Sequence, residues 1–196
     1  MSFNPKRHYS AVAVFSDDLE RVVLIHKLKP TWQAGKANLP GGKVEAEKDY
    51  INADVEDWQG TYEEACNEVY RRCAVRELRE ETGLDVAAAA LKLFCRLCFK
   101  TPEGDAAECC FFAARGDVDA ARTVEAERVF VGEVAEVIAG GVSYHYWSDR
   151  AMSDECGIIP TMPNLPYIVA MARQCLRGGD TTKTWPLTVY ENGATP

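Results

Sequence analysis

The 196-residue sequence contains no apolar run that approaches the length of a membrane-spanning segment. Such a helix needs about 20 consecutive apolar residues. Near the start, Lys6 and Arg7 lead directly into a short strand-like run, which differs from the pattern of a secretory signal. We therefore expect a cytoplasmic protein without a membrane partner.

Positive charge is also scarce. The chain has 22 lysines and arginines against 30 aspartates and glutamates, giving a formal net charge of −8. Proteins that bind a nucleic-acid polymer need a concentrated cationic surface, so we expect no such partner. A small anionic substrate is compatible with this charge if carboxylates hold a divalent cation, which reverses the local sign.

The eight cysteines are too few to form a disulfide scaffold in a chain of this length. Cys95 and Cys98 have the spacing of half a zinc site, but no second pair has matching spacing. They lie in the strand-like run 91–100, where residues three apart point to opposite faces. We expect buried, reduced thiols.

The apolar content, 47%, is enough for one domain with a sizeable core. Apolar and β-branched runs bounded by turn residues predict strands, and amphipathic runs with a capping pattern predict helices. Strands are predicted at 9–15, 21–28, 91–100, 108–115 and 128–131, and helices at 61–82, 134–139 and 165–176. Strands flanked by helices indicate an α/β fold with a mixed β-sheet between helical layers.

Two segments stand outside this pattern. Residues 45–60 are acidic without a clear period, which predicts an exposed insertion. Residues 178–196 form a C-terminal tail with one apolar patch. The insertion has three open roles: a lid over a cleft, part of a homodimer surface, or neither.

The helix predicted at 61–82 carries Glu77, Glu80 and Glu81 on one stripe about 100° wide, at about 100° per residue. Such spacing usually marks a solvated face, and the neighbouring arginines could pair with it. Like charges on one stripe cost stability, which a hard cation such as Mg²⁺ would turn into affinity. The preceding Gly41-Gly42 turn allows close approach of backbone to a metal or phosphate, which favours the metal site.

The segment Arg76–Leu84 has the sequence R-E-L-R-E-E-T-G-L, and L-P-G-G-K-V-E precedes it. Together they resemble the Nudix hydrolases, whose signature is G-x5-E-x7-R-E-U-x-E-E-x-G-U, where U is aliphatic. The second half matches without a departure. In the first half, Glu68 falls where the signature has glutamate and Tyr62 where it has glycine, while the Gly-Gly lies about twenty residues too early. We interpret this as an insertion within the box, at about 46–66.

The resemblance implies a single Nudix domain over 1–196, an α/β/α sandwich with a mixed β-sheet. It implies a hydrolase acting on phosphoric anhydride bonds with Mg²⁺ or Mn²⁺ as cofactor. Glu77, Glu80 and Glu81 would ligate the metal, with the Gly41 carbonyl adding an oxygen, and Arg76 would orient a glutamate.

A carboxylate would activate the attacking water, from the box or from a downstream loop. The catalytic candidates are Glu80, Glu81, Glu68, Glu125 and Glu127. On one unbroken helix Glu68 lies about 180° from Glu77, facing away from the metal stripe. Glu45, Glu47 and Glu64 are therefore alternatives to Glu68, and a plain surface charge is an alternative for each loop glutamate.

Substrate contacts are predicted at Lys27, Trp32, Lys43 and Asn164. The mutator-type 8-oxo-dGTP hydrolases, which the Asn164-Leu165-Pro166 junction resembles, place a purine-reading asparagine there. An amide offers both a donor and an acceptor to a purine edge. Asparagine is also a favoured helix N-cap. For Trp32 the alternative to stacking on a base is packing, and for the lysines it is solvation.

These residues favour hydrolysis of an (oxidised) purine nucleoside triphosphate. The alternatives are ADP-ribose or another nucleotide-sugar-like diphosphate, and a non-catalytic nucleotide sensor. A sensor commonly loses box glutamates, whereas this chain keeps all three on the helix. In each case the expected partner is a small-molecule nucleotide.

Overall fold

The computed structural model describes residues 6–49, 62–145 and 156–178. Seven strands form the main sheet, five of them in the order β3-β2-β1-β6-β5, while β4 pairs with β1 and β7 with β2. The strands are β1 (Arg7–Phe15), β2 (Arg21–His26), β3 (Ala37–Asn38), β4 (Gly41–Lys43), β5 (Lys92–Lys100), β6 (Ala106–Arg115) and β7 (Arg128–Glu133). β1 and β6 are parallel and the other pairs antiparallel, so the sheet is mixed.

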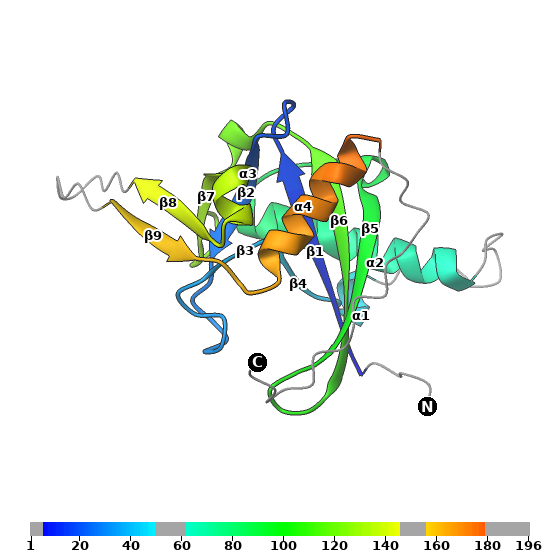
Figure 1. The fold of residues 1–196 in the computed structure, drawn as a ribbon. Coiled ribbons are helices and arrows are strands. Elements are labelled where there is room, and N and C mark those ends of the chain that lie inside the picture. Colours follow the sequence, from blue (N-terminus) through cyan, green and yellow to red (C-terminus); the bar gives the residue numbers. More distant parts are fainter. Residues whose placement is uncertain (1–5, 50–61, 146–155, 179–196) are drawn as a thin grey trace.

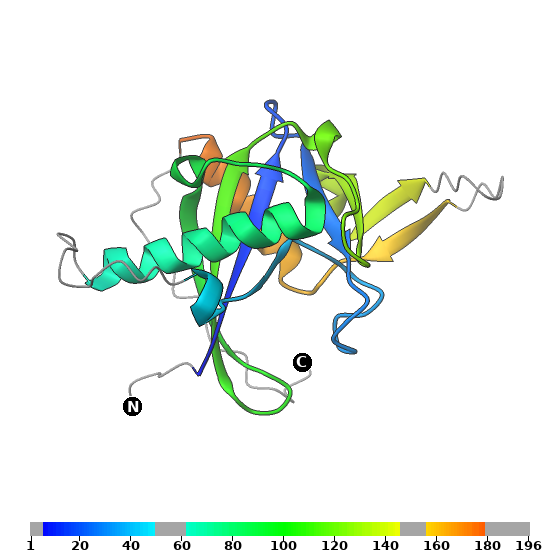
Figure 2. The same cartoon turned by 180° about the vertical axis from the view of Figure 1, so that it is seen from behind.

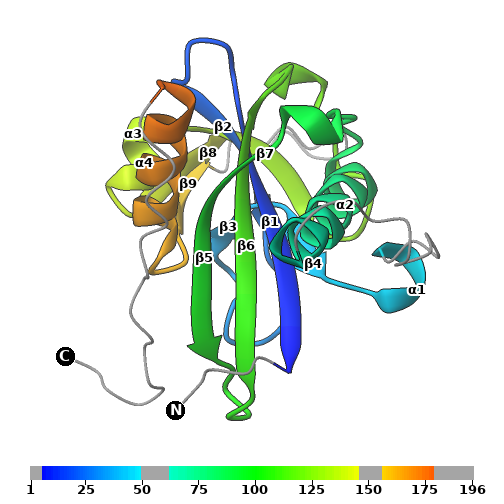
Figure 3. The ribbon, with the colours of Figure 1, turned by 90° about the vertical axis from the view of Figure 1, so that its right-hand side faces the viewer.

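Helices cover both faces of this sheet. Figure 3 shows it between α2 and α1 on one side and α3 and α4 on the other. The helices are α1 (Ala46–Asp49), α2 (Tyr62–Thr82), α3 (Val134–Ile138) and α4 (Leu165–Leu176), with short 3₁₀ turns η2 (Ala88–Ala90) and η3 (Val118–Ala120). The expected α/β/α sandwich with a mixed sheet is confirmed.

The core explains why β1 is apolar along most of its length. Ala11, Ala13 and Phe15 pack into the cluster that includes α4, whereas Val12 and Val14 pack into the cluster that includes α2. A strand with both faces covered has no position that favours a polar side chain. The central strands are therefore buried, and polar groups gather where the strands end.

The predicted strands and helices are confirmed, with bounds that move by a few residues at most. Cys95 opposes Phe111 and Cys98 opposes Glu108, on the two different faces expected for this pair. The sequence reasoning missed the short strands β3 and β4. It also missed a separate antiparallel pair, β8 (Gly141–His145) with β9 (Cys156–Pro160), which extends beside the main sheet (Figure 1).

The structure also bears on the expected absence of a membrane span and on the expected exposure of residues 45–60. No helix in the described ranges is long and apolar enough to span a bilayer. The expectation of an exposed segment at 45–60 is wrong for Asp49, which ends α1 with only 1% of its surface exposed. Residues 50–61 lie outside the described ranges, and residues 62–66 already belong to helix α2.

Candidate active site

Gly41 and Gly42, predicted as a turn, belong to strand β4, which lies against both β1 and helix α2 (Figure 2). A Cβ atom on Gly41 would lie 2.2 Å from the Ser10 carbonyl oxygen, and Gly41 has a φ of +153°. A Cβ on Gly42 would lie 2.4 Å from the Glu77 carboxyl group. Both glycines are therefore required by close packing: the first against the backbone of β1, the second against a box glutamate.

Glu81 is the most deeply buried of the three box glutamates. Its Oε2 accepts a hydrogen bond of 2.7 Å from the Gly41 N–H, and its Oε1 lies 3.6 Å from the Lys27 Nζ. The same ammonium lies 2.5 Å from Oε2 of Glu127. Residues from β4, α2, the end of β2 and the loop before β7 thus meet at one point.

The loop before β7 reaches this point because it is tied to the end of α2. The Arg122 N–H donates to the Thr82 carbonyl and the Val124 N–H to the Glu81 carbonyl. Gly83 ends the helix at a φ of +68°, and a Cβ there would lie 3.1 Å from Arg122 Nε. The glycine of the box therefore permits both the helix stop and the close passage of the loop.

Arg76 connects the remaining carboxylates. Its Nη1 group donates to Glu77 Oε1 at 2.7 Å and to Glu80 Oε2 at 3.0 Å. Its Nε and Nη2 groups donate to Asp49 Oδ1 and Oδ2 at 2.8 and 2.9 Å, and Nη2 also donates to the Lys43 carbonyl. This two-pronged arginine–carboxylate geometry fixes the guanidinium, which in turn holds two box glutamates.

Asp49 is a site residue that sequence reasoning missed. Glu68, Glu45, Glu47 and Glu64 were the candidates for the carboxylate that the signature places upstream of the arginine. Among the residues that the structure describes, the upstream carboxylate that meets Arg76 is Asp49, seven residues after Gly42. The spacing differs by one residue from the signature, and this near match was the only sequence signal that could have identified it.

Burial shapes the electrostatics of these groups. Burial raises the pKa of Glu81 to about 7, although Lys27 and the Gly41 N–H act in the opposite direction. Burial also raises the pKa of Glu77, against the effect of Arg76. For Asp49, burial acts to raise the pKa, but hydrogen bonds from Arg76 and the Glu45 N–H outweigh it, so the pKa is lowered. Burial therefore disfavours the charged form of Glu77 and Glu81, whereas hydrogen bonds favour the charged form of Asp49.

The donor chemistry fits a hard divalent cation, because the box supplies only carboxylate and carbonyl oxygens. In the described ranges, however, no three acidic, histidine or cysteine side chains converge closely enough to hold an ion as they stand. Arg76 contacts a carboxylate oxygen of Glu77 and of Glu80, and Lys27 contacts one of Glu81. Metal binding would require these side chains to turn away from their cations.

The charged residues described above form one site cluster: Lys27, Asp49, Arg76, Glu77, Glu80, Glu81 and Glu127. Some of the other predicted residues lie near this cluster and others lie elsewhere. Glu68 pairs with Arg71 and Arg72 of its own helix and does not join the cluster. Glu127 joins it, whereas Glu125 is exposed. Lys43 is exposed on β4, and Trp32 is 40% exposed on the loop between β2 and β3.

Asn164 lies at the start of α4, on the other helical layer. It occupies the N-cap position expected in the alternative interpretation, but its side chain makes no capping hydrogen bond. The segment 37–41 links it to the cluster, because the Ala37 carbonyl accepts from the Met162 N–H while the Gly41 N–H donates to Glu81.

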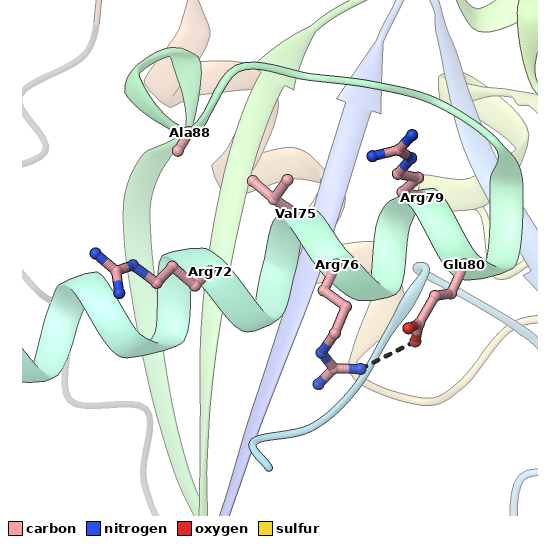
Figure 4. A pocket seen from close by; sticks show the side chains of 6 residues that line it. All are labelled: Arg72, Val75, Arg76, Arg79, Glu80 and Ala88. Carbon is pink, nitrogen blue, oxygen red and sulfur yellow. Dashed lines mark hydrogen bonds and ion pairs between the residues drawn. The ribbon is translucent and has the colours of Figure 1, made fainter. Parts of the chain in front are cut away.

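A pocket of about 500 Å³ opens on the solvent side of α2. It is lined by Arg72, Val75, Arg76, Arg79, Glu80 and Ala88 (Figure 4). The guanidinium groups of Arg72 and Arg79 extend to the same side in this view, whereas that of Arg76 is turned toward Glu80 (Figure 4). The pocket therefore touches the cluster only through Arg76 and Glu80.

Comparison with known proteins identifies the fold. A family model described as the NUDIX domain matches residues 6–138. A search of curated proteins gives no match. A solved structure of a MutT/nudix family protein from Enterococcus faecalis superposes with a TM-score of 0.52 at 12% identity, covering 82% of this chain and 53% of that one. This chain therefore spans about half the length of the Enterococcus protein.

Two structures of a Shewanella oneidensis protein are also similar. The NUDIX domain of NrtR, solved in complex with ADP ribose, gives a TM-score of 0.54 at 16% identity, covering 89% of this chain and 90% of that one. NrtR complexed with a 27mer DNA gives 0.52 at 15% identity, covering 87% and 62%. At these identities the likeness shows a common fold. Because the family model spans well over half of the chain, and the chain has this fold, the protein belongs to the NUDIX family.

Proposed function

We propose that the protein is a Mg²⁺- or Mn²⁺-dependent pyrophosphohydrolase that cleaves a nucleoside diphosphate-linked substrate. One observation carries the proposal: Glu81 of the box, Glu127 of the loop and Lys27 meet beside the Gly41 N–H. Carboxylates for a metal, a second carboxylate for a proton and a cation for phosphate are the groups that this hydrolysis requires.

The residues have separate roles in this proposal. A divalent cation held by Glu77, Glu80 and Glu81 would neutralise phosphate oxygens and activate a water molecule. Glu127 is the better candidate than Glu125 for the general base, because it is buried at the cluster while Glu125 is exposed. Arg76, fixed by Asp49, would hold Glu77 and Glu80 in place.

We favour an (oxidised) purine nucleoside triphosphate as substrate. Asn164 supports this choice, because its side-chain amide makes no capping bond and is only partly buried. Segment 37–41 hydrogen-bonds to Met162, two residues before Asn164, and to Glu81, so one extended substrate molecule would lie along it between Asn164 and the box. ADP-ribose is the main alternative, since the NrtR domain that shares the fold is solved with that ligand.

The direct test is a screen for phosphate or pyrophosphate release with Mg²⁺, over nucleoside triphosphates, dinucleotides, ADP-ribose and sugar nucleotides. We expect turnover of a purine triphosphate to exceed that of the matched pyrimidine. Tight binding of one compound without turnover of any would overturn the proposed hydrolase activity and would favour the alternative of a nucleotide sensor.

Asn164→Ala tests the choice of base. We expect a larger loss of kcat/KM with purine than with pyrimidine substrates, by about tenfold or more, because a two-point hydrogen bond to a base is lost. Equal losses on both would remove Asn164 from base recognition.

A further inference from the structure

The Lys27 side chain occupies a position between two buried carboxylates. Its own exposure is 13%, and the exposures of the Glu81 and Glu127 side chains are 8% and 7%. Each carboxylate uses one oxygen for a backbone N–H: Glu81 Oε2 accepts from Gly41 and Glu127 Oε1 accepts from Leu28. The other oxygen of each, Glu81 Oε1 and Glu127 Oε2, faces the Lys27 ammonium at 3.6 and 2.5 Å.

Glu81 Oε1 and Glu127 Oε2 thus form a pair of acceptors around the ammonium, called here the cradle, and the backbone hydrogen bonds to the other two oxygens hold both carboxylates in position. Buried carboxylates require a counter-ion, since leaving one unpaired is strongly unfavourable. The ammonium meets that requirement with a single charge on a flexible four-carbon stem. A divalent cation brings twice the charge and also prefers carboxylate oxygens.

We propose that Lys27 is the resident cation of the site, that a divalent metal ion bound at Glu81 displaces its ammonium from between Glu81 and Glu127, and that the released ammonium then binds a substrate phosphate. This inference rests on the proposed function. It adds a coupling between two binding events. Because metal binding would free the Lys27 ammonium to contact a substrate phosphate, metal and substrate would each favour the binding of the other.

The backbone around Lys27 supports a movement of the side chain alone. The Lys27 N–H donates to the Lys36 carbonyl at 3.0 Å, and the Lys27 carbonyl accepts from the Gly35 N–H at 2.9 Å. These two hydrogen bonds hold the residue at the end of β2, directly after His26. A rotation of the four-carbon stem is therefore enough to carry the ammonium out of the cradle.

Trace acetylation of the wild-type protein tests the release directly. The rate of Lys27 modification would be measured by peptide mass spectrometry in EDTA and in Mg²⁺ or Mn²⁺, with exposed Lys29 as the internal control. We expect the metal to raise the Lys27 rate by about tenfold, as the shielded amine is released, and to leave Lys29 unchanged. An unchanged or lower Lys27 rate in saturating metal would overturn the proposal.

A matched pair of variants tests the competition. Mn²⁺ affinity would be measured without substrate by electron paramagnetic resonance for wild type, Lys27→Met and Lys29→Met, which lose the same charge. We expect Lys27→Met to bind Mn²⁺ about tenfold more tightly, since a close competing charge is gone, and Lys29→Met to change by about twofold or less. Equal gains in both variants would mean a general charge effect and would overturn the proposal.

The two ideas fail differently. If wild type binds no Mn²⁺ at all, both the proposed metal-dependent function and this inference are wrong. If wild type binds Mn²⁺ but Lys27 is not released, only the inference is wrong. The labelling experiment uses wild-type protein, so it decides the question even if Lys27→Met does not fold.

Discussion

Helix α2 contains two stretches with similar residues and different surroundings. In the N-terminal stretch, Glu68 pairs with Arg71 and Arg72 at 3.0 and 3.2 Å, all within one helix. In the C-terminal stretch, Arg76 reaches Asp49 of α1, and Glu81 reaches Gly41 of β4. The same pattern of arginine and glutamate forms ion pairs within one helix in the first stretch and, with other segments, a candidate active site in the second.

The difference lies in the partners that other segments supply. Pairs at i, i+3 and i, i+4 on a helix surface contribute only a few tenths of a kcal/mol. The Arg76–Asp49 pair is largely removed from solvent, with side-chain exposures of 15% and 1%, and its geometry is two-pronged. A close contact to a distant segment therefore identifies the functional half of the helix better than its charge pattern does.

The largest expected effect comes from a pair of glutamate variants, one in each stretch. Glu80→Gln should lower kcat by about 100-fold or more, because it removes a carboxylate proposed to bind the metal. Glu68→Gln should change kcat by about twofold or less, since its partners are neighbours on the same helix. Steady-state rates on the best substrate of the screen would measure both. Similar losses in the two variants would contradict the distinction between the stretches.

The next effect is on stability. Asp49→Asn should lower the free energy of unfolding by about 3 kcal/mol, because it removes the two-pronged, buried partner of Arg76, which then keeps only Glu77 and Glu80. Glu68→Gln should lower it by about 0.5 kcal/mol or less. Urea denaturation at neutral pH measures both values. A small loss for Asp49→Asn would show that Asp49 does not hold Arg76.

The smallest effect separates packing from metal binding. Gly42→Ala places a methyl group 2.4 Å from the Glu77 carboxyl group, which must move. We expect an approximately tenfold loss of Mn²⁺ affinity, as for other changes that misplace a ligand, with a loss of stability of about 1 kcal/mol.

Gly104→Ala is the control for this variant. Gly104 has a φ of +87° in the turn between β5 and β6, and a methyl group there would meet no atom within 4 Å. It should also lose about 1 kcal/mol, from backbone strain alone, and keep its Mn²⁺ affinity. If both variants lose Mn²⁺ affinity equally, the contact between residue 42 and the Glu77 carboxyl group does not contribute specifically to metal binding.

Much of this molecule follows from its sequence. The apolar run along β1, the capping pattern before α2 and the stop at Gly83 predict elements that the structure contains. The stripe of Glu77, Glu80 and Glu81 follows from helical geometry alone, and the match to the signature indicated the family. These are local properties, in which each residue's conformation depends on neighbours within a few positions.

Only the tertiary structure decided which partners these residues meet. Asp49 rather than Glu68 contacts Arg76, Glu127 rather than Glu125 joins Glu81, and Lys27 lies between the two. The strands β8 and β9 were likewise missed, because a short pair with few neighbours has no periodic pattern to distinguish it. Contacts between segments tens of residues apart depend on how β4 and the loop before β7 dock against α2. That docking depends on close packing at glycines and on backbone hydrogen bonds between segments. Neither can be predicted from the spacing of residues in the sequence.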